Sequence, residues 1–247
     1  MNSKNNNTIE VSVIVPVFNE AGNIGLLAKE IASSLQDKDF ELIVVNDFST
    51  DGTLAELKDL RVEIPQLRIL SHEKNAGQSR AIRTGAMHAK GKILCMLDGD
   101  GQNVPSDLPN LLAHLQRKDA PKQLVMVGGV RQKRQDTFSK RLGSKLANAI
   151  RGAILADGTE DTGCGIKAID RNTYLSLPFF DHQHRYIPAL VQRDGLLVEF
   201  LPVQHRSRNS GTSKYSNFGR LLVAFRDLLG MKWLQARAKL PGNIHED

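Results

Sequence analysis

Two carboxylates stand close together in the segment LDGDGQ (97–102), and a side-chain amide follows them. Asp98, Asp100 and Gln102 are spaced two residues apart. In an extended segment alternate side chains point to the same side, so these three are expected to converge. Hard oxygen ligands of this kind suit Mg²⁺ or Mn²⁺, ions that also bridge diphosphate oxygens. Because a bare Asp-x-Asp pair is more often a solvated turn, the surrounding elements have to support the metal assignment.

Two further polar segments, PVFNE (16–20) and NDFSTDGT (46–53), follow apolar runs. In the second segment, Asp47 is predicted to hydrogen-bond a base or ribose. The alternative is a plain turn, because Ser, Thr and Asp are frequent helix N-caps. For the first segment the alternative is a strand end and helix cap, with Phe18 as a core residue.

Apolar runs alternate with helical periodicity along the first half of the chain. The runs at 11–17, 41–45, 67–70, 92–97 and 124–127 predict strands. Between them, apolar residues recur every three or four positions, as in 24–35. Alternating strands and helices indicate an α/β fold with a doubly wound, mostly parallel sheet. Ligands of such sheets bind beyond the carboxyl ends of the strands, where these polar motifs fall.

The second half is less regular. We expect a helix over 138–155, a short strand after the glycine-rich segment 157–165, a helix near 184–194 and a strand at 196–203. The predicted division is a disordered leader at 1–8, a catalytic domain at 9–215 and an amphipathic basic helix with a tail at 216–247. No internal repeat is present.

Four segments in order, VSVIVPVFNE, ELIVVNDFSTDGT, NAGQSRAIRTGAMHAKG and LDGDGQ, resemble family 2 glycosyltransferases of the GT-A fold. Two later segments, DTGCGIKAIDR (161–171) and RNSGTSK (208–214), resemble the dolichyl- and polyprenyl-phosphate sugar synthases, a group like dolichol-phosphate mannosyltransferase. The likeness covers roughly residues 9–216. It implies a metal-dependent enzyme that moves a sugar from a GDP- or UDP-sugar to a polyprenyl phosphate.

The resemblance also implies roles for individual residues. Nucleotide-binding positions are matched by Pro16, Val17, Phe18, Glu20, Val45 and Asp47. Metal and diphosphate positions are matched by Asp98, Gly99, Asp100 and Gln102, and phosphate-holding cations by Arg131, Arg208 and Lys214. Three residues depart from the usual pattern, namely Phe18 for tyrosine, Asn46 for the first of two aspartates, and Phe48 for glycine. These departures concern base and sugar recognition more than the reaction type.

A phosphate acceptor changes what the enzyme has to supply. The second pKa of a phosphate monoester is about 6, so its oxygen is already anionic near pH 7 and needs no dedicated general base. In-line attack on the anomeric carbon predicts inversion of configuration. The alternative enzyme acts on a sugar hydroxyl and needs a base, for which Glu160, Asp161 and Asp181 are candidates. A third interpretation is a non-catalytic protein that binds nucleotide sugars, and the intact metal motif argues against it.

Charge and composition suggest partners and location. The formal net charge of +6 favours phosphate-bearing partners, but an aromatic content of 5% without basic–aromatic interleaving argues against nucleic acid. No apolar run approaches the roughly 18 residues of a membrane span, and the start of the sequence is polar. The two cysteines are interpreted as free thiols. We therefore expect a cytoplasmic protein, peripheral on the cytoplasmic face of the membrane. The apolar face of 218–233 is predicted to lie in the membrane surface, or to pack on the domain or on a small membrane subunit.

Overall fold

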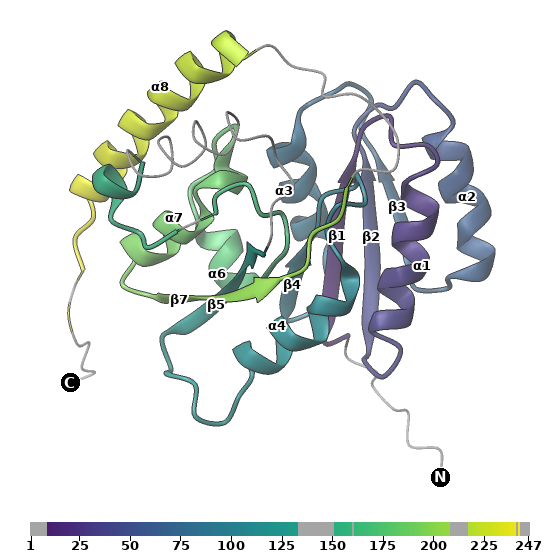
Figure 1. Ribbon diagram of the computed structural model, residues 1–247, viewed down its shortest axis with the longest axis horizontal. Coiled ribbons are helices and arrows are strands. Elements are labelled where there is room, and N and C mark those ends of the chain that lie inside the picture. The colour runs from purple at the N-terminus through teal and green to yellow at the C-terminus, as the bar shows by residue number, and fades with distance from the viewer. Residues whose placement is uncertain (1–8, 133–150, 160, 208–216, 241, 243–247) are drawn as a thin grey trace.

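The computed structural model describes residues 9–132, 151–159, 161–207, 217–240 and 242 of the chain (Figure 1). Its sheet has the strand order β3-β2-β1-β4-β6-β5-β7. The strands are β1 (Val11–Val17), β2 (Phe40–Asn46), β3 (Leu67–Ser71), β4 (Ile93–Met96), β5 (Leu124–Arg131), β6 (Lys167–Asp170) and β7 (Leu197–Val203). β6 runs antiparallel to both of its neighbours, and the other described pairs are parallel. The predicted mostly parallel α/β sheet is confirmed.

The central strands are apolar on both faces because helices cover both faces. Every residue of β1 and β2 is buried. Alternate side chains enter two different cores: Val13 and Val15 face one, and Ile14 between them faces the other. Both cysteines are buried and unpaired, as the sequence predicted.

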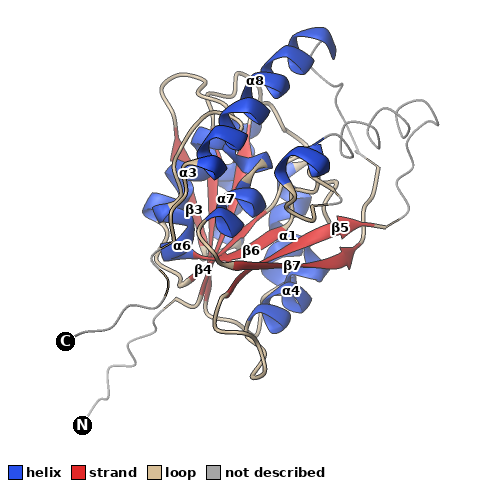
Figure 2. Cartoon of the chain, turned by 90° about the vertical axis from the view of Figure 1, so that its left-hand side faces the viewer, coloured by secondary structure: helices blue, strands red, loops and turns tan. Residues whose placement is uncertain are grey.

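Two helical layers enclose the sheet (Figure 2). One layer holds α1 (Ile24–Ser34), α2 (Thr53–Glu63) and α4 (Leu108–Leu115), the last preceded by the 3-10 turn η1 (Pro105–Asp107). The other holds α3 (Gln78–His88), α6 (Arg171–Ser176), the 3-10 turn η2 (Gln183–Arg185), α7 (Ile187–Arg193) and α8 (Asn217–Ala236). A Cβ on Gly85 would lie 2.6 Å from a methyl of Ile14, so α3 sits very close to the sheet. This contact fixes the start of α3 near the carboxyl edge.

The sequence missed α6, a helix of 6 residues that is too short to show a clear period. Of the helix predicted at 138–155, residues 151–155 are helical and the rest lies outside the described residues. The leader at 1–8 also lies outside them.

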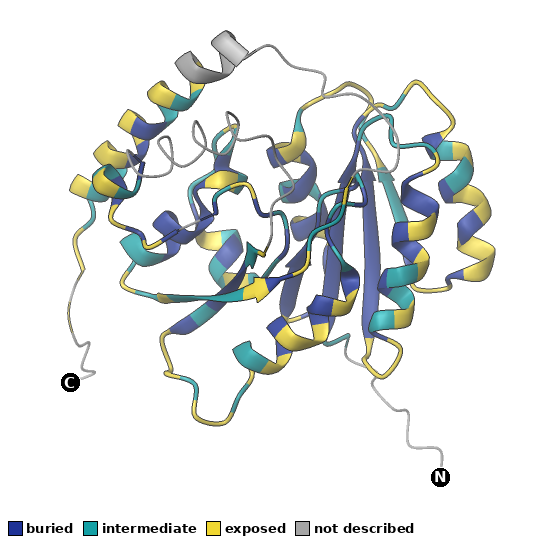
Figure 3. Cartoon of the chain, viewed as in Figure 1, coloured by how far each residue is buried: buried dark blue, intermediate teal, exposed yellow. Residues whose placement is uncertain are grey.

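The C-terminal helix α8 differs from its prediction. Its apolar residues were expected on one face, but they divide between two. Leu228 and Met231 are buried against the domain, whereas Phe225, Leu229 and Trp233 are 57%, 53% and 62% exposed (Figure 3). The prediction of a single face is therefore wrong, and α8 both packs on the domain and presents an apolar row to its surroundings. Of the helices in the described part of the chain, none is long and apolar enough to cross a membrane.

Candidate active site

The carboxyl ends of β2, β1 and β4 are neighbours, so the polar segments that follow them meet at one edge of the sheet. Two of these segments are joined by hydrogen bonds. The amide of Asn19 donates to Ser49 Oγ at 2.9 Å, and Asn19 Oδ1 accepts from the amide of Thr50 at 2.7 Å. Asp51 accepts from the amide of Ala21 at 3.2 Å. The polar residues after β2 therefore hold the loop after β1. The N-cap of α2 is Gly52, and Asp51 Oδ1 also accepts from the amide of Thr53, the first residue of α2, at 3.0 Å.

The predicted nucleotide-binding residues fall into two groups. Pro16, Val17 and Val45 are buried within the sheet, so only their backbone atoms are available to a ligand. Phe18 and Glu20 are half-buried in the loop after β1. Their contact with a nucleotide stays a prediction.

The carboxylate of Asp47 accepts hydrogen bonds from the protein itself. Its Oδ1 accepts from the amide of Ala76 at 2.8 Å and lies 2.7 Å from His72 Nδ1. Its Oδ2 accepts from the amide of Gly77 at 2.8 Å. The carboxylate thereby fixes segment 72–77, which leads into α3. Contact between Asp47 and a base or ribose is likewise still a prediction.

The segment 98–102 forms a turn, so the expectation of an extended stretch is wrong. Gly101 has φ +74°, and Asp100 Oδ1 accepts from the amide of Gln102 at 3.1 Å. Gln102 directs its side-chain nitrogen toward the carbonyl of Arg206, 3.5 Å away. A Cβ on Gly99 would lie 2.6 Å from a methyl of Val17, which explains the glycine between the two carboxylates. The turn brings Asp98 and Asp100 together electrostatically, but not by the alternation that the sequence suggested.

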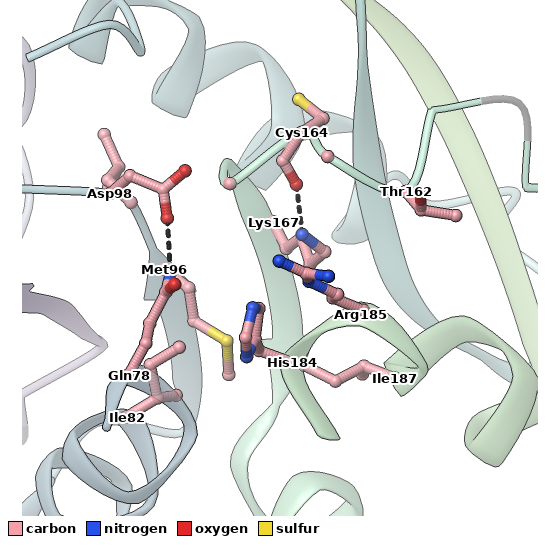
Figure 4. Close-up of a pocket in the computed structure, with 13 residues that line it drawn as sticks. Gln78, Ile82, Met96, Asp98, Thr162, Cys164, Lys167, His184, Arg185 and Ile187 are labelled. Atoms are coloured by element: carbon pink, nitrogen blue, oxygen red, sulfur yellow. Dashed lines mark hydrogen bonds between the residues drawn. The ribbon is translucent and has the colours of Figure 1, made fainter. Parts of the chain in front are cut away.

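Asp98 is a half-buried carboxylate with little compensation from the protein. Its Oδ1 accepts from Gln78 Nε2 at 2.7 Å (Figure 4), and this is the one hydrogen bond to its carboxylate among the described residues. Burial raises the pKa of Asp98, and the charge of Asp100 raises it further, against weaker opposing effects of Lys167, Gln78 and Arg131. A cation beside it would relieve both effects.

The two carboxylates fit a divalent cation. Among the described residues there is no cluster of three His, Cys, Asp or Glu side chains that would enclose a metal ion. Mg²⁺ in phosphate-transfer sites is commonly held by one or two carboxylates, with substrate phosphates and water completing its shell. Asp98 and Asp100 match that pattern, and the side-chain oxygen of Gln102 is a third hard ligand type. These residues have the hard oxygens that part of such a coordination shell needs, and their binding of a metal ion stays a prediction.

A cavity of about 150 Å³ adjoins Asp98. Its polar lining includes Gln78, Asp98, Thr162, Lys167 and the pair His184 and Arg185 (Figure 4). The sequence had suggested no role for the side chains of Gln78, Lys167, His184 or Arg185. No spacing rule links them, because the fold brings them together from α3, β6 and η2. Gln78, inside the NAGQSR segment, and Lys167, inside DTGCGIKAIDR, lay in recognised motifs, whereas His184 and Arg185 did not.

The cavity lowers the pKa of two of its basic residues. Burial, followed by the nearby cations Arg185 and Lys167, lowers the pKa of His184 well below its usual value, so its ring is neutral at pH 7. Its Nδ1 lies 2.6 Å from Ser79 Oγ. Burial also lowers the pKa of Lys167, which donates a hydrogen bond to the carbonyl of Cys164.

Arg131 lies beside the cavity in a bidentate ion pair. Its Nε and Nη2 each lie 2.6 Å from an oxygen of Asp161. Burial lowers the pKa of Arg131, but the hydrogen bonds and charge of Asp161 outweigh that effect and raise it. Asp161 also accepts from the amide of Gly163 at 3.3 Å. The pair fixes the orientation of both side chains.

The remaining candidates lie elsewhere. Asp181, whose side chain is 70% exposed, accepts a hydrogen bond from the amide of His182 and does not line the cavity. Arg208, Lys214 and Glu160 lie outside the described residues.

Solved structures share the fold. Glucosyl-3-phosphoglycerate synthase of Mycobacterium tuberculosis, in complex with Mn²⁺ and UDP, matches 95% of this chain and 81% of its own with a TM-score of 0.66 and 18% identity. A mannosyltransferase of Pyrobaculum calidifontis, in complex with GDP-mannose and Mn²⁺, matches 94% of this chain and 66% of its own with a TM-score of 0.65 and 20% identity. At this level of identity the likeness shows the GT-A fold.

Two curated relatives are closer in sequence. Dodecaprenyl-phosphate galacturonate synthase of Rhizobium johnstonii is 30% identical over 96% of this chain and 70% of its own length. Undecaprenyl-phosphate 4-deoxy-4-formamido-L-arabinose transferase of an Enterobacter species is 33% identical over 89% of this chain and 66% of its own length. The sequence profile of Glycosyl transferase family 2 matches residues 12–181, a range that includes the joined loops, the carboxylate turn and most of the cavity lining. With the motifs, the sheet and the profile in agreement, the chain is a glycosyltransferase that belongs to family 2.

Proposed function

We propose that this enzyme transfers a sugar from a nucleotide-sugar donor to the phosphate of a polyprenyl lipid, with inversion and with the help of one divalent metal ion. Both curated relatives are named for sugar transfer to a polyprenyl phosphate. They are longer than this chain, which spans 70% and 66% of their lengths. The acceptor assignment therefore needs support from the site itself.

The observation that carries the proposal is the lack of a free carboxylate base among the described residues of the site. Asp98 is the only carboxylate among the described residues that line the cavity. Asp161, a candidate base for a hydroxyl acceptor, has both oxygens engaged by Arg131 at 2.6 Å. A hydroxyl acceptor has to lose a proton, whereas a phosphate monoester is already anionic at pH 7. The described site therefore suits a phosphate better than a hydroxyl.

In this proposal Asp98, Asp100 and Gln102 hold the metal ion beside the donor diphosphate. When bound, the ion supplies positive charge that stabilises the leaving nucleotide. The backbones of Pro16, Val17 and Val45, with Phe18, Glu20 and Asp47, form the nucleotide side of the site. These roles follow the family resemblance together with their position at the carboxyl edge of the sheet.

The cations have a separate task, which is to bring two phosphate groups together. Arg131, held in place by Asp161, orients the donor phosphates, since a fixed guanidinium binds phosphate bidentately. Arg208 and Lys214 assist from their segment of the chain. Screening the repulsion between donor and acceptor lets the acceptor oxygen approach the anomeric carbon in line with the departing diphosphate. That geometry gives inversion.

The test is a screen of nucleotide-sugar donors in which the transferred sugar is detected on the lipid. Purified protein is incubated with a short polyprenyl phosphate, Mn²⁺ or Mg²⁺, and UDP- and GDP-sugars in turn, and the extracted lipid is weighed by mass spectrometry. We expect the wild-type protein to produce a lipid that is heavier by one sugar unit. This product should not form without metal or with the Asp100→Ala variant, and it should still form with the surface control Arg61→Gln. Nucleotide release that appears only with a glycan hydroxyl acceptor would contradict the proposal.

A lipid substrate also needs a place at the membrane. We propose that α8, together with the flanking residues of 216–247, is a membrane-facing segment. It is attached to the catalytic domain of residues 9–215. The exposed row of Phe225, Leu229 and Trp233 lies along one side of α8, and Arg226 and Lys232 are exposed beside it. An apolar row bordered by cations binds anionic bilayers. The enzyme is then peripheral on the cytoplasmic face.

Co-sedimentation with vesicles tests this assignment. Trp233→Ser is expected to lower binding to anionic vesicles severalfold while leaving the melting temperature unchanged, because its side chain is 62% exposed. Vesicle binding that is unaffected by Trp233→Ser would favour a small membrane subunit as the partner of α8.

A further inference from the structure

Three hydrogen-bond donors gather on one side of the cavity, and the proposed function has given them no role. The Lys167 ammonium comes from β6, and the His184 ring and the Arg185 guanidinium come from η2. Figure 4 shows the three side chains next to one another, with Asp98 and Gln78 across the cavity. Two cations so close repel each other, and such an arrangement calls for an anion between them.

Arg185 is unusual among the arginines near the site. Arg131, Arg151 and Arg206 each form a bidentate ion pair, with Asp161, Asp157 and Glu30 respectively. Arg185 forms no ion pair with any carboxylate in the described ranges, although it lines the cavity. Asp227 feels the charge of Arg185 without forming an ion pair with it, so the donors of this guanidinium are open to a ligand in the cavity.

Lys167 is only partly satisfied. Its ammonium donates to the carbonyl of Cys164, and an ammonium has three donors. Of the acids around it, Asp161 is paired with Arg131, and Asp98 lies on the other side of the cavity. A half-buried cation whose pKa is lowered by desolvation is stabilised when an anion accepts from it.

His184 adds a neutral donor. Ser79 Oγ accepts from the backbone amide of His184 at 3.3 Å and lies 2.6 Å from its Nδ1. In the tautomer in which the Ser79 hydroxyl donates to Nδ1, the ring proton of the neutral imidazole is on Nε2. In this tautomer His184 adds an N–H donor to a cavity that already holds two cations.

We propose that Lys167, His184 and Arg185 form a subsite for an oxyanion of a substrate, next to the carboxylate turn. The inference rests on the proposed function, because the two anions at hand are the phosphate of the lipid acceptor and a carboxylate of the transferred sugar. Both present oxygens that accept from several N–H groups at once. A neutral sugar would leave both cations without a partner.

Arg185→Gln is the variant that tests this subsite. Arg185 is exposed and has no ion pair to lose within the described chain, so the substitution leaves the fold intact, which a thermal melt verifies. The matched control is Arg61→Gln. Arg61 is also exposed, and it lies in the last turn of α2, at the opposite end of the sheet from the site.

Calorimetric titration measures binding without turnover, so its result does not depend on whether sugar transfer occurs. One arm compares a ten-carbon prenyl phosphate with the corresponding prenyl alcohol. The other arm, run with Mn²⁺, compares UDP-glucuronate with UDP-glucose. In each arm the two probes differ in the anionic group, and wild type, Arg185→Gln and Arg61→Gln are titrated in parallel.

We expect Arg185→Gln to weaken one anionic probe about 10- to 100-fold, the usual effect of losing a charge-assisted hydrogen bond, while Arg61→Gln has no effect. If Arg185→Gln weakens the binding of the prenyl phosphate alone, the subsite is assigned to the acceptor. If Arg185→Gln weakens the binding of UDP-glucuronate but not of UDP-glucose, the subsite is assigned to the sugar carboxylate. If Arg185→Gln weakens neither anionic probe, the subsite is refuted. A chain that keeps the subsite and fails the lipid donor screen would refute only the proposed function.

Discussion

The carboxyl ends of β2 and β4 carry carboxylates that look equivalent in the sequence but differ in the structure. Asp47 and Asp98 each follow a buried strand, with only β1 between those strands in the sheet. Asp47 is surrounded by donors, namely two backbone amides and the His72 ring. Asp98 accepts one hydrogen bond, from Gln78, among the described residues.

This difference separates a structural carboxylate from a ligand-binding one. A buried carboxylate whose oxygens are satisfied by the protein stabilises the segment that supplies the donors. A half-buried carboxylate with one donor and a like charge nearby destabilises the protein, and is retained where a ligand compensates it. Asp47 belongs to the first kind and Asp98 to the second. Four substitutions test the distinction.

Asp98→Asn should produce the largest effect. We expect the rate of sugar transfer to fall about 1000-fold, the scale on which single electrostatic contacts to a transition state contribute. The free energy of unfolding should not decrease, because burial and Asp100 raise the pKa of Asp98 and its ionised form is unfavourable in the folded protein. Lipid-transfer rates and urea unfolding at pH 7 measure the two quantities. A loss of stability in parallel with the loss of activity would show that Asp98 is structural after all.

Asp47→Ala should give the opposite pattern. Two part-buried amides and the half-buried His72 ring would lose their acceptor, and an unsatisfied donor costs about 1–3 kcal/mol where water is excluded and less where it is not. We expect the free energy of unfolding to fall by about 2 kcal/mol, measured by urea denaturation. Asp59→Ala, at an exposed position of α2, is the matched control and should be nearly neutral. If Asp47→Ala unfolds like the wild type but binds nucleotide poorly, Asp47 contacts the donor instead of holding the loop.

Asp161→Asn tests a carboxylate that lies between the two kinds. In the proposed reaction Asp161 positions Arg131, so its loss should reduce the rate of transfer to a polyprenyl phosphate about tenfold through a less ordered guanidinium. The profile of rate against pH should keep its shape, since no base is removed. A loss of 1000-fold or more, together with a lost basic limb in that profile, would identify Asp161 as a general base and restore the hydroxyl acceptor.

The same contrast shows what the sequence is able to predict. Strand runs such as 11–17 are apolar because both faces are buried, so their type and place are visible locally. Asp98 was identified because a short motif carries its chemistry. Lys167 and Arg185 were not, because their meeting depends on the antiparallel placement of β6 and the path of the chain into η2.

Helix α8 shows a second limit. Leu228 and Leu229 are adjacent in sequence and point about 100° apart, so both fit a broad apolar stripe. Only packing decides that Leu228 is buried and Leu229 exposed. Periodicity predicted the helix, but it did not predict which side meets the domain.

Glu41, in β2, offers the smallest and most controlled test. It is buried, and it accepts from Ser12 Oγ at 2.7 Å, from the amide of Lys90 at 2.6 Å and from Arg68. Burial raises the pKa of Glu41, but these three donors outweigh burial and hold the pKa below its usual 4.5. By the criterion that separates Asp47 from Asp98, Glu41 is structural.

A lowered pKa in the folded state means that ionised Glu41 stabilises the protein above pH 4.5, and that this stabilisation is lost as the pH falls through the folded-state pKa. Glu41→Gln should therefore lower the free energy of unfolding by about 1–2 kcal/mol at pH 7, and the difference from wild type should shrink below pH 4.5. Urea denaturation at pH 7, 5 and 4 measures it. Glu63→Gln, which removes an exposed ion pair with Lys29, is the control and should change little at any pH. A Glu41→Gln deficit that stays constant with pH would mean that packing, not the carboxylate charge, accounts for the role of Glu41, and the donor-count criterion would fail for it.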